Sequence, residues 1–140
     1  MVKHSNSIPP TPTNPFFRSR MHSFRHAFSG WWFVIRTQRN AWIHAIISVL
    51  VISVSLWLGI SPGSWALIIL AIALVWTAEF LNTALEAVVD LASPQQHQLA
   101  QVGKDVGAAA VLIAAASAAL IGFLILGPPL WQHLSPLFIK

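Results

Sequence analysis

The sequence contains no cysteine, and only four of its 140 residues are acidic. Without cysteine, the chain forms no disulfide bond and holds no metal through thiolate ligands. Neither a G-x-x-x-x-G-K-[ST] loop nor a G-x-G-x-x-G motif occurs, which excludes P-loop enzymes and protein-kinase folds. The six histidines are scattered, and the pair His22 and His26 lies beside arginine, so no metal-binding histidine pair is predicted.

Hydrophobic residues make up 56% of the chain and charged residues 9%. A soluble domain of this length has no core large enough to bury so much apolar surface, so the composition indicates one membrane-embedded domain. The net charge of +4 would also suit nucleic-acid binding, but six of the eight basic residues precede the first long apolar run. This asymmetry predicts a cytoplasmic N-terminus and argues against a nucleic-acid partner.

The region before the first apolar run has two parts. Residues 1–15 are rich in proline and polar residues, and we expect them to be a disordered tail. Residues 16–37 carry a narrow apolar stripe beside a basic one, which predicts an amphipathic helix lying in the inner membrane interface. An ordinary surface helix packed on the bundle is the alternative. The apolar stripe consists of Phe17, Met21, Phe24, Phe28, Trp31 and Ile35.

Three apolar runs are each long enough to cross a hydrocarbon core of about 30 Å, which takes roughly 20 helical residues. They predict transmembrane helices over about 41–59, 64–91 and 104–127. The third run is rich in alanine and begins with Gly103 and Gly107, so we expect it to approach its neighbours closely. Together with the interfacial helix, the three spans predict an all-α membrane fold.

The connections between the spans are short. Pro62-Gly63 predicts a tight outer turn, and residues 92–102 predict a polar cytoplasmic loop. Gly127-Pro128-Pro129 predicts the end of the third span. Since three spans reverse the side of the membrane, we expect the tail 128–140 to lie outside, leaving residues 16–127 as the functional domain.

The four acidic residues all lie in the second span or just beyond it. On a helix, the polar residues of this stretch share one face at about 100° per residue. With Trp65 at the outer interface, a rise of about 1.5 Å per residue places Glu79 about 21 Å into the membrane. A carboxylate at that depth costs a few kcal/mol and indicates a functional site, although pairing with a neighbouring helix is a structural alternative. The polar face comprises Glu79, Asn82, Thr83, Glu86 and Asp90.

The third span opens with Lys104 and Asp105 at the depth where Glu86 and Asp90 finish the second, so we expect these side chains to lie close together. Carboxylates there can hold Mg²⁺ that carries phosphates, and a lysine offsets phosphate charge. The deeper Glu79 can take a proton from a lipid hydroxyl. The pattern therefore predicts phosphoryl transfer from a water-soluble donor to a lipid.

Two other functions use the same acids. A proton or ion pathway would relay charge through Glu79, Glu86 and Asp90, but residues 65–75 toward the outer face are entirely apolar, which favours a site open to one side. A purely structural oligomer held together by Glu79 leaves the Lys104-Asp105 pair without a role.

Three stretches carry a family resemblance: Glu79-Phe-Leu-Asn-Thr-Ala-Leu-Glu-Ala-Val-Val-Asp90, Ser93-Pro94 with His97, and Lys104-Asp105-Val-Gly-Ala-Ala-Ala-Val-Leu112. On these residues the sequence resembles the small prokaryotic integral-membrane diacylglycerol kinases and undecaprenol kinases. The similarity extends over about residues 20–125. It implies a homotrimer of three-span subunits in a bacterial-type inner membrane, using Mg²⁺ and ATP to phosphorylate a membrane lipid.

The resemblance also implies roles for individual residues. Glu79 is the general base, Glu86 binds the Mg-nucleotide, and Gln38 stands where the family pattern has a second metal-binding glutamate. An amide oxygen can coordinate Mg²⁺ without charge, so a weakly active or inactive relative is an open alternative. The choice between diacylglycerol and undecaprenol is also open. The implied ATP-binding residues are Asn82, Glu86, His97, Lys104 and Asp105.

Overall fold

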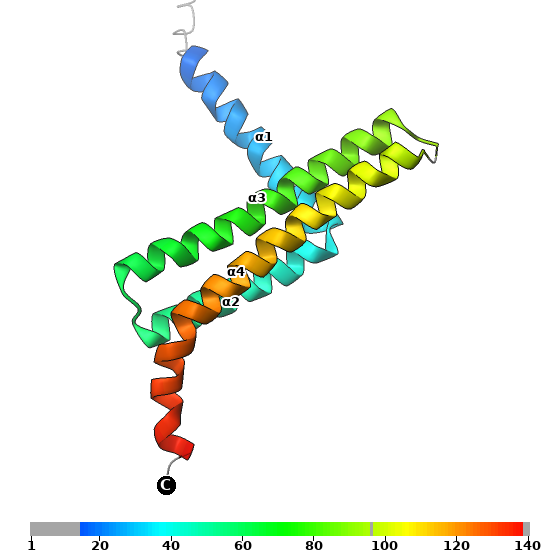
Figure 1. Ribbon diagram of the computed structural model, residues 1–140. Helices are drawn as coiled ribbons and strands as arrows, with labels where there is room; N and C mark the ends of the chain where they lie inside the picture. The colour runs from blue at the N-terminus through cyan, green and yellow to red at the C-terminus, as the bar shows by residue number, and fades with distance from the viewer. Residues whose placement is uncertain (1–14, 96, 139–140) are drawn as a thin grey trace, which may run out of the picture. The chain divides into compact units, whose positions relative to one another are not determined.

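The computed structural model describes residues 15–95 and 97–138, and these residues form four helices and no strand. Three of the helices, α2, α3 and α4, are long and apolar enough to cross a membrane, which confirms the predicted all-α, three-span fold. The predicted disordered tail falls almost entirely on residues 1–14, outside the described residues. The helices are α1 (Pro15–Thr37), α2 (Arg39–Leu58), α3 (Pro62–Ala92) and α4 (Gln98–Phe138) (Figure 1).

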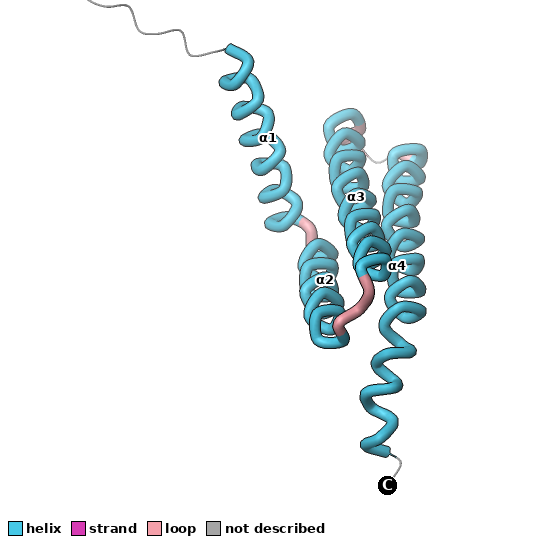
Figure 2. Tube along the Cα trace, turned by 90° about the vertical axis from the view of Figure 1, so that its left-hand side faces the viewer, coloured by secondary structure: helices cyan, strands magenta, loops and turns pink. Residues whose placement is uncertain are grey.

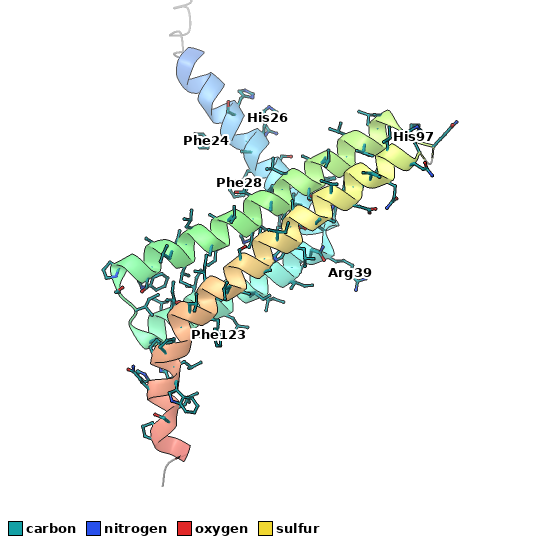
Figure 3. All side chains as sticks on the ribbon, viewed as in Figure 1. Phe24, His26, Phe28, Arg39, His97 and Phe123 are labelled. Atoms are coloured by element: carbon teal, nitrogen blue, oxygen red, sulfur yellow. The ribbon has the colours of Figure 1, made fainter. Side chains whose placement is uncertain are left out.

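The chain divides into two units, residues 1–33 and residues 34–140. The described part of the first unit belongs to α1. Phe24 and Phe28 project from one side of this helix and His26 from the opposite side, and all three are exposed (Figure 3). The predicted helix is therefore confirmed, and its place in the membrane interface stays a prediction.

The α2–α3 turn is built from Gly59 to Ser61. Gly59 ends α2 in the left-handed conformation (φ 60°), where its N–H donates to the carbonyl of Leu56 at 3.2 Å. Ser61 caps α3, because its Oγ accepts the N–H of Ser64 at 3.2 Å. Pro62 follows as the first helical residue, a position that suits a residue without an N–H. The prediction that Pro62-Gly63 itself forms the turn is wrong.

The α3–α4 connection is shorter than predicted. Within residues 92–102, helix α4 already begins at Gln98, because His97 caps it and glutamine is a good helix former. The Nδ1 atom of His97 accepts the N–H of Leu99 at 3.2 Å, and its carbonyl accepts the N–H of Gln101 at 3.1 Å. The loop prediction was therefore wrong for residues 98–102.

Helix α4 continues through Pro128, Pro129 and Pro136, so the prediction that it ends at Gly127 is wrong. Each proline removes one backbone hydrogen bond, and this bends a helix without preventing helical residues beyond the bend. Figure 1 shows α4 changing direction where its colour passes from orange to red. Beyond the bend, the ring of His133 lies 5.4 Å from that of Trp57 near the end of α2.

Helices α3 and α4 form an antiparallel hairpin, and α2 packs against both (Figures 1 and 2). The buried apolar core is small, and most large side chains along the three helices remain exposed, such as Leu70 at 65% and Phe123 at 74%. Exposed apolar surfaces of this kind suit contact with lipid. The buried apolar residues include Ala41, Ile68, Ala71, Val75, Val111, Ala114 and Leu126.

Helix α4 lies close to α3 at Gly107, one of the two glycines from which close packing was predicted. A Cβ atom at Gly107 would collide with Oδ1 of Asn82 and lie 3.1 Å from Cδ2 of Leu85. A Cβ atom at Gly103 would meet Cγ2 of Val89 at 3.9 Å, an ordinary contact. Of these two glycines, therefore, Gly107 is the one in tight contact with side chains of α3.

Candidate functional site

The deeper part of the polar face of α3 is turned into the bundle, whereas Asp90 at its end is exposed. Glu79, Asn82 and Thr83 are buried, and Glu79 is only 1% exposed. The hydroxyl of Thr83 donates to the carbonyl of Glu79 at 2.9 Å, so it is satisfied within its own helix. Glu79 is therefore a carboxyl group enclosed by protein among apolar spans, as its predicted depth requires.

The neighbour of Glu79 is His44 on α2. The Nε2 atom of His44 lies 3.7 Å from Oε2 of Glu79. Both atoms are buried and have no hydrogen-bond partner among the residues that the structure describes. The sequence analysis did not pair His44 with Glu79, because the two lie 35 positions apart on different helices.

Glu86 accepts two amide hydrogen bonds, one on each carboxyl oxygen. Nε2 of Gln38 donates to Oε2 at 3.1 Å, and Nδ2 of Asn82 donates to Oε1 at 2.9 Å. Gln38 reaches this position because it is the single non-helical residue before α2, with an extended backbone. The structure thus brings together Gln38, Asn82 and Glu86, and the metal and nucleotide roles that the resemblance implies for them stay predictions.

Two grooves meet at His44. The amide groove, of about 420 Å³, carries Gln38, Asn82 and Glu86 on its walls. The apolar groove, of about 430 Å³, runs between α2, α3 and α4 as far as Phe123 and Leu126. The residues common to both walls are Ile43, His44 and Ala115.

A third groove, the hairpin-end groove, lies at the α3–α4 connection, where Figure 3 labels His97. It has a volume of about 490 Å³ and is lined by residues that include Asp90, His97 and Lys104. The ammonium group of Lys104 forms an ion pair with Oδ1 of Asp90, which confirms the predicted proximity of these two residues. Glu86 lines the amide groove instead, so the predicted cluster is divided between two grooves.

Asp105 makes a local contact. Its Oδ1 atom accepts a hydrogen bond from Nε2 of Gln101, one helical turn earlier, at 2.9 Å. His97 likewise has a structural role as the cap of α4. The nucleotide contacts expected of both residues stay predictions.

Within residues 15–95 and 97–138, no group of three or more histidine or acidic side chains is arranged to hold a metal ion. The amide groove nevertheless offers hard oxygen donors. Its walls include Glu86 and Gln38, which offer a carboxylate and an amide oxygen. This set fits Mg²⁺, which usually takes one or two protein carboxylates and completes its shell with water and substrate phosphates.

The matching family model and the similar proteins agree on one family. The family model described as prokaryotic diacylglycerol kinase matches residues 25–126. A diacylglycerol kinase of Synechocystis is 44% identical over 109 residues, which cover 77% of this chain and 62% of that relative, so this chain spans less than two thirds of its length. An undecaprenol kinase of Bacillus subtilis is 38% identical over 117 residues, 84% of this chain and 92% of the relative. A diacylglycerol kinase of Escherichia coli is 37% identical over 102 residues, 68% of this chain and 80% of the relative.

Proposed function

The chain belongs to the prokaryotic diacylglycerol kinase family, and we propose that it is a membrane lipid kinase that transfers the γ-phosphoryl group of ATP to a lipid hydroxyl. The observation that carries this proposal is the buried carboxyl of Glu79, 1% exposed, on the same face of α3 as Glu86. Names of the relatives include both diacylglycerol kinase and undecaprenol kinase. Either lipid alcohol is therefore a candidate substrate.

In the proposed reaction, Glu79 accepts the proton of the lipid hydroxyl as the hydroxyl oxygen attacks the γ-phosphorus. A new oxygen–phosphorus bond forms, the bond to the β,γ-bridging oxygen breaks, and ADP leaves. Phosphoryl transfer depends mainly on positioning and on stabilising charge, so a small site can perform it. The burial of Glu79 supports this role because it keeps competing water away from the base.

The amide groove is the proposed site of the phosphates. Glu86 would hold Mg²⁺ together with the phosphates, and the amides of Gln38 and Asn82 would keep the Glu86 carboxylate in place. When bound, the metal would offset the negative charge that phosphoryl transfer concentrates. Lys104 would contribute a further positive charge by exchanging Asp90 for a phosphate oxygen.

The hairpin-end groove is the proposed place for the rest of the nucleotide, with His97 and Asp105 nearby. The apolar groove suits the hydrocarbon part of a lipid, because it starts at His44 and continues along apolar side chains to Leu126. Its apolar walls also disfavour an ion pathway toward the outer face. On the basis of the family resemblance, we also propose that the protein forms a homotrimer.

The test uses purified protein in micelles with labelled ATP and Mg²⁺, and with diacylglycerol and undecaprenol in parallel. We expect phosphorylation of at least one lipid, and we expect Glu79→Gln to lower it about 10²–10⁴-fold, the range for removing a general base. Thr83→Val is the matched control, because Thr83 is buried on the same face but bonds only its own helix. A Glu79→Gln variant as active as the Thr83→Val variant would refute the assignment of Glu79 as the base.

A further inference from the structure

We propose that His44 is a positioning residue that holds the carboxyl group of Glu79 in its reactive orientation. This inference rests on the proposed function of Glu79 as the base. The ring of His44 lies on α2 and the carboxyl on α3, with Nε2 and Oε2 3.7 Å apart. Positioning here means that His44 acts on the reaction through Glu79.

Helix α3 contacts both the ring and the backbone of His44 through Trp76. Trp76 lies one turn before Glu79, and its ring meets that of His44 edge to face, with centroids 6.5 Å apart and planes at 68°. The indole Nε1 of Trp76 also donates to Oγ of Ser48 at 3.3 Å, and that hydroxyl donates to the carbonyl of His44 at 2.7 Å. Trp76 thus contacts the His44 ring directly and its backbone through Ser48, from the side of α3 that also carries Glu79.

The unsatisfied atoms of the pair point to the same conclusion. Nε2 of His44 and Oε2 of Glu79 are both buried without a hydrogen-bond partner among the described residues. Leaving two such groups unsatisfied is costly, so a shift of about 0.5–1 Å that joins them by a hydrogen bond of normal length is favourable. Catalytic hydrogen bonds are often long in unliganded enzymes and shorten when substrate binds.

The contact between His44 and Glu79 lies close to the place where the two proposed substrates would meet. His44 is part of the wall shared by the amide groove and the apolar groove, where a lipid hydroxyl would meet the nucleotide phosphates. A carboxyl group that is free to rotate at this junction would spend less time directed at the hydroxyl. Misplacement of a reacting group by about 1 Å can cost about 10²-fold in rate.

The experiment compares two substitutions of similar length. His44→Gln keeps an N–H donor near the position of Nε2, whereas His44→Met fills the space without a donor. Both are assayed in micelles with MgATP and each of the two lipids, and kcat and KM are measured separately for ATP and for lipid. We expect His44→Met to lower kcat about 10–100-fold with the KM for ATP unchanged, and His44→Gln to stay within about threefold of wild type.

A second readout separates positioning from packing. If His44 acts through Glu79, His44→Met should reduce kcat much less in a Glu79→Asp background, where the shorter side chain has already lost the contact. Thermal stability in micelles is measured for every variant. The inference is overturned by a wild-type kcat in His44→Met, by equal kcat losses in His44→Met and His44→Gln, or by effects of His44→Met that are the same in both backgrounds.

The Glu79→Gln variant distinguishes a failure of the positioning role of His44 from a failure of the proposed function. An active Glu79→Gln variant would remove Glu79 as the base, whatever happens at His44. An inactive Glu79→Gln variant together with a fully active His44→Met variant would leave the base assigned and reject only the positioning role.

Discussion

The two polar regions of the molecule differ in how far they are removed from solvent. Around Glu79 and Glu86, which we call the buried region, Glu79 is 1% exposed, Asn82 is buried, and Gln38 and Glu86 are half-buried. At the end of the α3–α4 hairpin, the side chain of Asp90 is 65% exposed and that of Lys104 is 34% exposed. Exposed ion pairs are worth little, whereas a buried carboxyl lowers stability unless it is well paired.

This difference indicates that the buried region takes part in the reaction, whereas the exposed region attracts a charged ligand. The buried Oε2 atom of Glu79 has no hydrogen-bond partner among the described residues, which is hard to explain by stability and favours a role in the reaction. The exposed pair of Lys104 and Asp90 can open readily to meet a charged ligand. We therefore expect substitutions in the buried region to have much larger effects on the rate than substitutions in the exposed region.

The largest effect among the following variants should come from Glu86→Ala. It removes the one carboxylate of the amide groove and leaves the amide donors of Gln38 and Asn82 without their acceptor. We expect kcat/KM for MgATP to fall about 10²-fold or more, because positioning of the phosphates is lost. A Mg²⁺ titration of activity should also show a higher apparent requirement. Near-normal values for both would place the phosphates elsewhere.

Gly107→Ala tests whether the buried region needs the close approach of α3 and α4. The new methyl group would displace the Asn82 amide that holds Glu86, and overpacking of this kind costs about 1–3 kcal/mol. We expect lower thermal stability in micelles and lower activity. Gly103→Ala is the matched control, because its methyl group would make only an ordinary contact with Val89. Equal behaviour of the two variants would contradict the role of Gly107.

Gln38→Glu tests the buried region by adding a second negative charge beside Glu86. A second carboxylate would stand about as close to Glu86 as the present 3.1 Å hydrogen bond, so the two would repel each other without a cation. We expect lower stability without Mg²⁺ and an apparent Mg²⁺ affinity about three- to tenfold higher, since Mg²⁺ binds through one or two carboxylates. An unchanged magnesium titration would remove Gln38 from the site.

The smallest effect should come from Asp90→Asn in the exposed region. Loss of one exposed ion pair changes stability by about 0–1 kcal/mol. The freed Lys104 should lower the KM for ATP slightly at low ionic strength, and added salt should remove the difference because it screens exposed charges. A loss of kcat as large as that of Glu86→Ala would show that the exposed region affects the rate as strongly as the buried region does.

The sequence predicted the helices well because their apolar runs are long and strongly charge-depleted. It predicted their ends less well. Capping decided the start of α4, where His97 accepts the N–H of Leu99, and the prolines at 128 and 129 bend the helix where they were expected to end it. These outcomes depend on local hydrogen bonds that periodicity does not reveal.

The polar face of α3 was also predictable, because a fixed angle per residue places Glu79 and Glu86 together. The partners from α2 were harder to find. Gln38 was noted through the family resemblance, but its hydrogen bond to Glu86 depends on the packing of α2 against α3. His44 carried only a weak signal, a lone histidine in an apolar span, and its contact with Glu79 depends on the same packing.

The most direct test of the central claim measures two properties of the same Glu79→Gln sample: MgATP binding and phosphoryl transfer to lipid under single-turnover conditions. If the buried carboxyl is the base, the variant should bind MgATP with wild-type affinity while its transfer rate falls about 10²–10⁴-fold. Transfer at the wild-type rate would contradict the claim.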